Sequence, residues 1–428
     1  MTPTARETGG RAGCDDATVV AHAGRHRGAV RAAVRRAWLV SAAAGALAGA
    51  AACETRTSAP PAQESRAEVE STLLLIGDAG APGLYRDGGE EPVLVALARE
   101  VRAADGRATV VFLGDNVYEA GVPLEPGTEA RARAVEVLQR QRTGENRFPA
   151  GTRSIFVPGN HDWNDGNGTP DPRGAERVRA QGEILARADA SGRQGAPRVT
   201  SVLSPQGGCP GPAVYDLGPR LRLVTIDTEW WLQPAGARTC REPGVPHDSA
   251  GSVNALRAAV AGAGDRHVVV VGHHPFLTGG EHGARCERTL SWCSVGQLVT
   301  SPGRQDTPSA GNARMRAALG EAMRAHPPLL YAAGHDHDLQ VLRGVGGPAP
   351  VARYLAVSGA GIFGHQTRVR CLDESLVALQ APGFMRLDVL TDGSARLAVL
   401  TVDADGVPAE RAHVWLTEGR PSAPTCDR

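Results

Sequence analysis

Residues 109–121, TVVFLGDNVYEAG, contain the pattern that decides the fold of this chain. A short apolar run reads as a buried strand, and it ends at a glycine that is followed by polar side chains. A glycine lets the backbone turn sharply and present the next side chain inward. The same order of apolar run, glycine and polar side chain occurs five times. The five turns are Gly77-Asp78-Ala79-Gly80, Gly114-Asp115-Asn116-Val117-Tyr118, Gly159-Asn160-His161-Asp162, Gly272-His273-His274-Pro275 and Gly334-His335-Asp336-His337.

Strand-like and helix-like patterns alternate along the chain, which predicts an α/β body. The predicted strands are 72–76, 109–113, 154–157, 221–226, 267–271 and 329–333. The predicted helices are 92–104, 129–142, 173–190, 253–261 and 313–325. Further strands at 354–357, 383–390 and 396–402 have no helical pattern between them, which predicts a closing antiparallel hairpin region.

The five turns are expected to meet, because the carboxyl ends of the strands in an α/β sheet lie at one edge. Each turn also has a purely structural interpretation. An aspartate after glycine can bond its own backbone, Asn160-His161 can cap a helix, and His273-His274 can be buried core histidines. The recurrence of the pattern at five strand ends favours a shared metal site instead.

The side chains at these turns include enough ligands for two metal ions. They are two carboxylates, a phenol, an amide oxygen and three imidazoles, with no thiolate: Asp78, Asp115, Tyr118, Asn160, His273, His335 and His337. This set favours hard or borderline metals such as Fe, Zn or Mn. A phenolate is a hard ligand, so Tyr118 indicates Fe(III).

The composition excludes several classes of function. A chain of 428 residues with 42% hydrophobic and 21% charged residues is globular rather than disordered or fibrous. Its 46 basic residues balance 46 acidic ones, so charge gives no argument for a nucleic-acid scaffold or an anionic membrane as partner. The sequence contains no lysine, which excludes P-loop, Schiff-base and lysine-nucleophile chemistry.

The N-terminal segment, 1–53, is predicted to be an extension with an export signal. Arg35 and Arg36 precede the weakly apolar run 38–52, which is shorter than the ~20 residues that a membrane span needs. The arginine pair fits a twin-arginine signal and Cys53 fits a lipoprotein cleavage site, while a buried alanine-rich helix is the structural alternative. Residues 54–70 read as a polar linker, and 71–428 as the folded catalytic domain.

Eight cysteines are present, and Cys14 and Cys53 lie in the N-terminal segment. An even number of six in an exported chain suggests disulfides. None of the six lies in a CxxC zinc pattern, which argues against a metal site built from thiolates. The six are Cys209, Cys240, Cys286, Cys293, Cys371 and Cys426. Spacing does not determine their pairing, although Cys286 and Cys293 are expected to close a local loop.

The order of these motifs resembles the calcineurin-like metallophosphoesterases. Tyr118 in the second motif narrows the resemblance to the purple acid phosphatases, of the small single-domain tartrate-resistant type. The matching stretches are LGDNVYEAG, PGNHDW, VVGHHPF, GEHG, AAGHDHDLQ and SGAG. The resemblance implies a sandwich of two mixed β-sheets flanked by helices, with a dinuclear metal site at the carboxyl ends of the strands.

The resemblance also implies a role for each site residue. Ligands of a ferric ion would be Asp78, Tyr118 and His337, with Asp115 as the bridging carboxylate. Ligands of a divalent ion (Fe, Zn or Mn) would be Asn160, His273 and His335. His161 and His282 match the histidines that contact the phosphate and donate a proton in catalysis. His274 stands where the family often has tyrosine and is expected at the rim, while residues 286–308 depart from the family's pattern.

The function that the resemblance implies is hydrolysis of phosphomonoesters by an exported acid phosphatase with a metal-bound hydroxide nucleophile. The expected substrate is a small phosphorylated molecule, and the chain is expected to be a monomer, periplasmic, secreted or anchored by a lipid on Cys53. A Zn- or Mn-dependent phosphodiesterase or nucleotidase of the same superfamily is the enzymatic alternative. A metal-bearing binding protein without catalysis is the alternative from another class.

Overall fold

The computed structural model describes residues 68–164, 170–190, 199–283, 303–345 and 350–417. All of them fall within one unit of the chain, residues 63–428. The predicted export segment, 1–53, and nearly all of the predicted linker, 54–70, lie outside the described residues, and both boundaries stay predictions. Among the residues that are described, no helix has the length and apolarity needed to cross a membrane.

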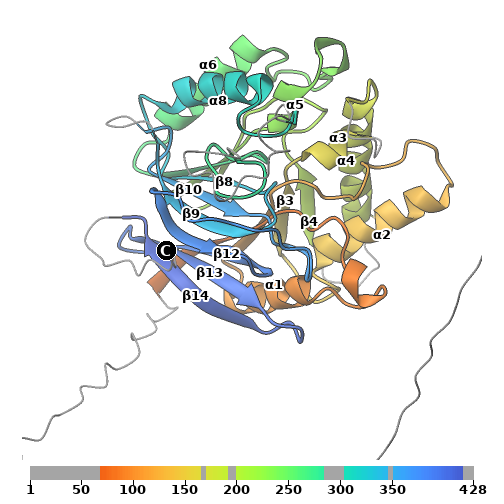
Figure 1. Ribbon diagram of the computed structural model, residues 1–428, viewed down its shortest axis with the longest axis horizontal. Coiled ribbons are helices and arrows are strands. Elements are labelled where there is room, and N and C mark those ends of the chain that lie inside the picture. Colours follow the sequence, from red (N-terminus) through yellow and green to blue (C-terminus); the bar gives the residue numbers. More distant parts are fainter. Residues whose placement is uncertain (1–67, 165–169, 191–198, 284–302, 346–349, 418–428) are drawn as a thin grey trace, which may run out of the picture. The chain divides into compact units, whose positions relative to one another are not determined.

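The first of two seven-stranded sheets contains the strands that begin and end the described chain (Figure 1). Its order is β14-β13-β12-β1-β2-β3-β4. Strands β1 to β4 are parallel, and β12 runs antiparallel to β1 and begins the antiparallel series β12-β13-β14. The bounds are β1 Val69–Ile76, β2 Ala108–Phe112, β3 Arg153–Phe156, β4 Thr200–Leu203, β12 Gly383–Leu390, β13 Ala395–Val402 and β14 Pro408–Trp415.

The second sheet has the order β11-β9-β10-β8-β7-β6-β5. Strands β6, β7, β8 and β10 are parallel neighbours, while β5, β9 and β11 are antiparallel to the strands they pair with. The bounds are β5 Ala213–Asp216, β6 Leu221–Thr225, β7 His267–Val271, β8 Leu330–Ala333, β9 Leu339–Arg343, β10 Tyr354–Ser358 and β11 Ser375–Leu379. Both sheets are therefore mixed.

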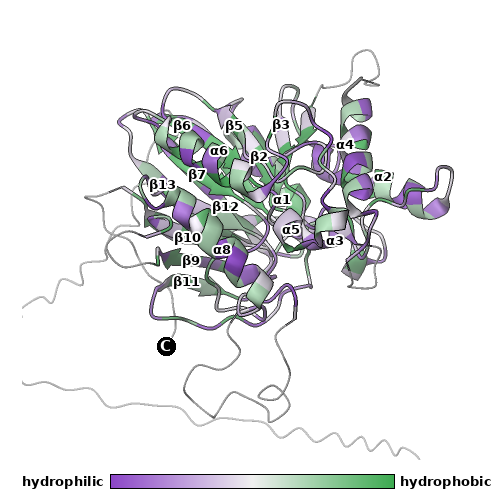
Figure 2. Ribbon diagram, turned by 90° about the horizontal axis from the view of Figure 1, so that it is seen from above, coloured by the Kyte–Doolittle hydropathy of each residue, from purple (hydrophilic) through white to green (hydrophobic). Residues whose placement is uncertain are grey.

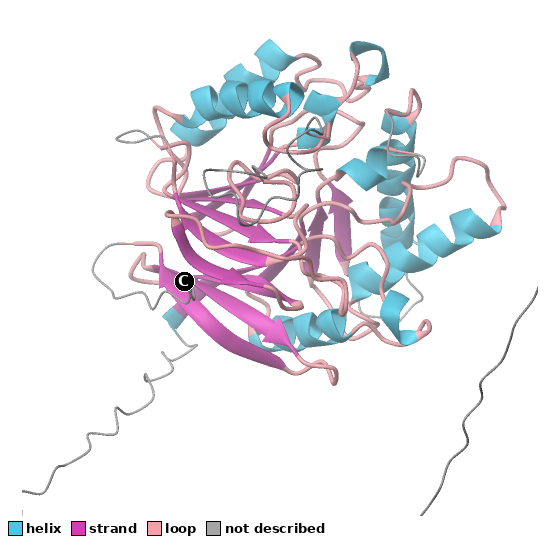
Figure 3. Cartoon of the chain, viewed as in Figure 1, coloured by secondary structure: helices cyan, strands magenta, loops and turns pink. Residues whose placement is uncertain are grey.

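Alternate side chains of the strands enter different cores. In β1, Leu73 and Leu75 belong to the cluster between the sheets, together with Val269 and Val271 of β7. Leu74 of β1 belongs to a second cluster, which also contains side chains of the helices α1, α2 and α4. A third cluster joins the other face of the second sheet to α6 and α8. The layers are helix, sheet, sheet and helix (Figure 3), and the strands carry most of the apolar sequence (Figure 2).

This arrangement confirms the predicted α/β sandwich of two mixed sheets flanked by helices. The longer helices are α1 Pro92–Ala103, α2 Glu129–Thr143, α4 Gly174–Ala190, α6 Ser249–Ala261 and α8 Ala310–Met323. The short ones are η2 Leu84–Arg86, α3 Asn160–Trp163, α5 Thr228–Leu232 and η3 Ala235–Ala237. Stacking of Phe112 on Phe156, with ring centroids 4.3 Å apart, joins β2 to β3 on the helix side and contributes about 1 kcal/mol beyond burial.

The helix starts follow their capping residues. Pro92 occupies the first turn of α1 as predicted, and the Glu91 side chain accepts a hydrogen bond from the Val93 amide. Two helices begin earlier than apolar periodicity indicates, because the caps lie ahead of the apolar residues. Asp248 caps α6 through the Gly251 amide, and Ser309 caps α8 through the Asn312 amide.

The C-terminal region differs in part from the prediction. Strands β12, β13 and β14 do form an antiparallel series at one edge of the first sheet. Strand β10 instead lies in the second sheet, where it pairs in parallel with β8 and antiparallel with β9. It belongs there because its buried residues Leu355 and Ala356 complete the cores on the two faces of that sheet.

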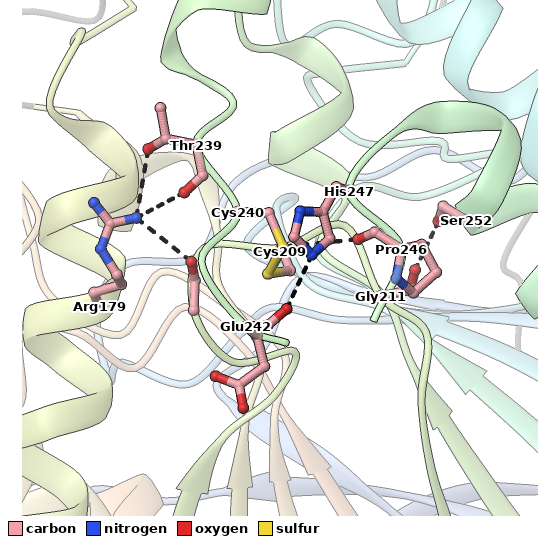
Figure 4. The surroundings of a disulfide bond; sticks show 10 residues. Arg179, Cys209, Gly211, Thr239, Cys240, Glu242, Pro246, His247 and Ser252 are labelled. Carbon is pink, nitrogen blue, oxygen red and sulfur yellow. Dashed lines mark hydrogen bonds between the residues drawn. A yellow bond between two sulfur atoms is a disulfide. The ribbon is translucent and has the colours of Figure 1, made fainter. Parts of the chain in front are cut away.

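One disulfide joins Cys209 to Cys240, and thus the loop after β4 to the loop before α6 (Figure 4). Arg179 of α4 reinforces this link by donating hydrogen bonds to the Gly207 and Thr239 carbonyls. Closing a loop of 31 residues restricts the unfolded chain by roughly 3–4 kcal/mol. Cys371 is also disulfide-bonded, whereas the predicted Cys286–Cys293 link lies outside the described residues.

Candidate metal centre

The seven predicted metal ligands lie in turns at the carboxyl ends of five parallel strands. Those of the first sheet follow β1, β2 and β3, and those of the second sheet follow β7 and β8. Three of them have left-handed backbone conformations, with φ of 58° at Asp78, 54° at Asp115 and 73° at His335. The adjacent glycines leave room for them. A Cβ atom at Gly114 would collide with the His273 ring, and one at Gly159 would collide with the Asp115 carboxylate.

Four of these side chains meet around the Tyr118 hydroxyl. That oxygen lies 3.1 Å from Asp78 Oδ1, 3.2 Å from Asp115 Oδ2 and 3.2 Å from His337 Nε2. A hydroxyl has a single proton and can donate to only one of the two carboxylates. The position therefore suits a cation, which two carboxylates, a phenolate and an imidazole can share.

The other three side chains meet around the Asn160 amide oxygen. Asn160 Oδ1 lies 2.8 Å from His273 Nε2 and 3.1 Å from His335 Nδ1, and these two ring nitrogens are 3.2 Å apart. All three residues are buried, with exposed fractions of 8% or less. One amide oxygen and two imidazoles that converge in this way can serve as a second set of metal ligands.

Asp115 joins the two groups. Its Oδ2 atom faces the Tyr118 hydroxyl, and its Oδ1 atom lies 3.5 Å from His273 Nε2. The Asp115 side chain is buried, and its Oδ1 also accepts a hydrogen bond of 2.9 Å from the His161 amide. A carboxylate with one oxygen toward each group is positioned as a bridging ligand.

The hydrogen bonds behind the histidines fit a pair of metal ions. His273 Nδ1 lies 2.9 Å from the Leu113 carbonyl, which can only accept, so the proton is on Nδ1 and Nε2 keeps a lone pair for a metal. On His337 the atom facing the cluster is Nε2, while the buried Nδ1 has no partner among the described residues. The donor set and its orientation therefore fit the metals that the sequence indicates.

Without a metal, protons must offset the negative charge of the site. Burial disfavours a charged imidazole, but Asp115 and Asp78 outweigh burial and raise the pKa of His273 to about 10. Burial together with Asp78 and Asp115 raises the pKa of Tyr118 well above its ordinary value. A tyrosinate at this position thus needs a cation beside it, and metal binding releases the protons that the ligands carry.

Comparison with known proteins identifies the family. The model of the calcineurin-like phosphoesterases matches residues 71–339, which is more than half of the chain. The chain belongs to the calcineurin-like phosphoesterases. No curated protein sequence matches the chain.

Solved structures are similar to this calcineurin-like phosphoesterase at low identity. GAP50, described as the anchor in the inner membrane complex of Plasmodium, is 14% identical with a TM-score of 0.50, over 82% of this chain and 90% of GAP50. The purple acid phosphatase PPD1 from yellow lupin (Lupinus luteus) seeds is 12% identical with a TM-score of 0.49, over 79% of this chain and 52% of PPD1. PhoD is 12% identical with a TM-score of 0.49, over 81% of this chain and 69% of PhoD.

The two predicted catalytic histidines of this calcineurin-like phosphoesterase pack against different predicted ligands. His161 packs edge-on against Tyr118, with ring centroids 4.6 Å apart, and its Nδ1 lies 2.7 Å from the Glu119 carbonyl. His282 stacks on His335, with centroids 4.0 Å apart. About a third of each histidine side chain is exposed (33% for His161 and 36% for His282), so both are accessible from solvent.

Asp306, which the sequence analysis missed, orients His282. Its Oδ1 atom lies 2.8 Å from His282 Nδ1, and its side chain is 3% exposed. Burial disfavours the imidazolium, but Asp306 and Asp336 outweigh burial and raise the pKa of His282. The pair is separated by 24 residues, so no local motif could have indicated it.

Asp162 joins two of the motif turns. Its carboxylate accepts hydrogen bonds from the amides of Gly159, Asn116 and Val117. Burial, with a contribution from Asp115, raises its pKa to about 7. Asp162 is visible in the sequence as the last residue of Gly-Asn-His-Asp. Its role could not be predicted, because it depends on contacts with the turn after β2.

His274 differs from the prediction, because it is fully buried rather than at the rim. Its Nδ1 lies 2.8 Å from Thr228 Oγ1, and its Nε2 lies 2.7 Å from Gln305 Oε1. Burial and the neighbouring His273 hold its pKa well below the ordinary value. His274 packs against His273 and His335, with ring centroids 5.0 and 4.6 Å away, and both of its ring nitrogens are hydrogen-bonded.

Proposed function

We propose that this calcineurin-like phosphoesterase is an exported acid phosphatase of the purple acid phosphatase type, which hydrolyses phosphomonoesters with an Fe(III) ion and a divalent metal. The observation that carries the proposal is the contact of the Tyr118 hydroxyl with Asp78, Asp115 and His337. A phenolate among hard ligands favours a ferric ion over Zn or Mn.

In this proposal the ferric ion is held by Asp78, Tyr118, His337 and the bridging Asp115. The divalent ion, Fe, Zn or Mn, is held by Asp115, Asn160, His273 and His335. When bound, such a pair supplies Lewis acidity toward phosphoryl oxygens and lowers the pKa of water, which generates a nucleophile. The buried walls of the site strengthen the attraction of an anionic phosphate.

The partly exposed histidines bind the phosphate and supply the leaving group with a proton. His282 is suited to donate, because Asp306 at its Nδ1 fixes the ring and favours the protonated form. His161 is held through its Nδ1 by the Glu119 carbonyl, which leaves its Nε2 edge for the substrate. If His161→Ala and His282→Ala both leave turnover of an alkyl phosphate intact, this assignment is wrong.

Tyr118 provides the decisive test of the metal. The protein is purified, its metal content is measured, and its visible absorption is compared with that of Tyr118→Phe. A phenolate bound to Fe(III) gives a charge-transfer band, which the variant should lose together with much of its iron. A colourless, active protein whose spectrum and iron content do not change on Tyr118→Phe would contradict the ferric assignment.

The same preparation separates the alternatives. Hydrolysis of p-nitrophenyl phosphate but not of its bis-ester is expected for the monoesterase. Activity mainly toward the bis-ester, with Zn or Mn bound, would indicate a phosphodiesterase instead. A fully metallated protein that hydrolyses neither ester would indicate a metal-bearing binding protein.

Export is supported by the Cys209–Cys240 disulfide, because disulfides persist in oxidising compartments. We propose that residues 1–53 direct the chain out of the cytoplasm and that Cys53 is the candidate site of a lipid anchor. We also propose that the mature protein is a monomer without nucleic-acid partners. Mass spectrometry of the mature N-terminus tests this part. An N-terminus that retains residues 1–52 would contradict it.

A further inference from the structure

Two large apolar side chains are exposed beside the candidate metal centre. Leu84 is 56% exposed and Tyr85 is 55% exposed, both on the single turn η2. The Tyr85 ring lies edge-on to His365, with centroids 5.6 Å apart. His365 in turn lies 4.4 Å from His337 and 6.1 Å from Tyr118 between ring centroids. A chain of ring contacts thus leads from the metal ligands to an exposed aromatic surface.

Hydrogen bonds from neighbouring segments hold the turn η2 in place. The Glu91 side chain is 1% exposed and accepts hydrogen bonds from the Gly83 amide at 3.0 Å and the Phe363 amide at 2.9 Å. This carboxylate therefore ties η2 to the loop that carries His365. Arg140 holds the same turn by donating to the Pro82 carbonyl at 2.8 Å and the Gly89 carbonyl at 2.7 Å.

Packing fixes the orientation of the Tyr85 ring. Gly364 has φ of 91°, and a Cβ atom there would lie 3.2 Å from Tyr85 Cβ, so the loop backbone fits closely under the tyrosine. The adjacent His365 is half-buried, and its Nδ1 has no partner among the described residues. Arg86, the next residue on the turn, directs its guanidinium to the Ala404 carbonyl. The exposed Leu84 and Tyr85 thus lie on a turn whose arginine is engaged elsewhere.

Single exposed apolar residues are common and need no explanation. Two neighbours on a braced turn, next to a group of converging metal ligands, are typical of a binding surface. We propose that Leu84, Tyr85 and His365 form a platform for a planar aromatic ring in the alcohol portion of the phosphomonoester. This inference rests on the proposed function, since the ester's phosphate would lie at the metal ligands.

A matched pair of substrates tests the platform. Adenosine 5′-monophosphate and ribose 5-phosphate share the same primary ester, and only the first carries an aromatic base. Tyr85→Ala should lower kcat/KM for the nucleotide about tenfold, mainly through KM, because base stacking on one aromatic ring is of that order. The value for ribose 5-phosphate should stay within about twofold. Tyr85→Phe should behave as the parent, and Val135→Ala, at a 41% exposed site on α2, is the control for lost surface area.

Phenyl phosphate shows how far from the phosphate ester the platform binds an aromatic ring. A loss on Tyr85→Ala for the nucleotide alone places the platform one sugar away from the ester, whereas a loss for phenyl phosphate alone places it at the ester oxygen; both outcomes support the proposal. Equal losses for all three substrates, or no loss for either aromatic one, would overturn it.

Binding calorimetry separates this inference from the proposed function. If the metallated protein hydrolyses none of the three, the phosphatase proposal fails, and nucleotide binding is compared with ribose 5-phosphate binding. Tighter binding of the nucleotide that Tyr85→Ala abolishes would still support the platform. The inference would be overturned if the parent protein bound neither the nucleotide nor phenyl phosphate more tightly than ribose 5-phosphate.

Discussion

Asp306 and His282 show how one buried carboxylate can prepare a side chain for proton transfer. Their 2.8 Å contact fixes the imidazole with Nδ1 toward the carboxylate, while the face of the ring stacks on His335. Asp306 also accepts a hydrogen bond from the Gly303 amide, so the carboxylate itself is held in place. Support of this kind is characteristic of groups that act on a substrate through a neighbour.

We expect Asp306→Asn to lower kcat for an alkyl phosphate by about ten- to hundredfold, with little change in KM. The variant weakens the protonated form of His282, and an alkoxide leaving group needs that proton. p-Nitrophenyl phosphate, whose leaving group needs little protonation, should be hydrolysed nearly as before. Asp216→Asn, at an exposed ion pair with Arg222, is the control. An equal loss for both substrates would mean that Asp306 is only structural.

The sequence correctly predicted that individual site residues lie together where the proposed ligands follow strands. The seven predicted ligands are brought together, because each motif ends a strand whose neighbours the fold determines. Asp306 was missed since it approaches His282 from a segment with no periodic pattern. The burial of His274 was misjudged for a related reason, because its partners Thr228 and Gln305 come from distant segments.

The short helix α5 carries a buried acid at its start. Asp227 accepts hydrogen bonds from the Trp230 amide at 3.0 Å and from Trp163 Nε1 at 2.9 Å, which joins α5 to α3. Burial raises its pKa to about 8, although both hydrogen bonds favour the ionised form. At neutral pH the folded protein therefore binds a proton on Asp227. The unfolded chain has lost this proton, because an aspartate there has a pKa of ~3.9.

This difference makes stability fall as pH rises from about 4 to about 8, because the folded state binds more protons over that interval. Asp227→Asn removes the titration, so its free energy of unfolding should depend less on pH, by up to ~1.4 kcal/mol per pH unit. Urea unfolding at pH 5, 6, 7 and 8 measures the slope. Parallel curves for the variant and the parent would show that Asp227 is ionised in the folded protein.

Sequence patterns located the central, mostly buried strands better than the edges of the sheets. The bounds of β7 and β12 agree with the prediction, since both strands have a neighbour on each side and bury nearly all of their residues. Strands β5 and β14 were missed, because each lies at a sheet edge and exposes several residues. Strand β9 was missed because buried Gln340 interrupts its apolar pattern, although Asp338 and Thr278 satisfy its amide group.

At the scale of the whole molecule, the candidate metal ligands come from both sheets. Asp78, Asp115 and Asn160 follow strands of the first sheet, and His273 and His335 follow strands of the second. Metal ions bound here would connect the two sheets at one edge, in addition to the apolar core between them. Binding to the folded state alone stabilises it by mass action.

Removal of metal by a chelator should therefore lower the melting temperature of the protein. At free metal a hundredfold above its dissociation constant, the expected loss is about 2.7 kcal/mol. Calorimetry with and without chelator measures the shift, and restored metal should reverse it. Asn160→Ala, which removes one ligand, should show a smaller shift. An identical melting temperature in both states would contradict a metal link between the sheets.

The pairing of β1 with β12 has a consequence for how the protein is made. The Thr72 hydroxyl donates to Asp388, a residue 316 positions later, and β1 leads directly into Asp78. A growing chain thus produces the first strand of the sheet early and its antiparallel neighbour near the end of translation. Until β12 is available, one edge of β1 lacks its hydrogen-bonding partner and invites wrong pairing. A ribosome that terminates between residues 338 and 382 would release a polypeptide with every proposed metal ligand present and the first sheet unfinished, a product for proteolysis rather than for metal loading.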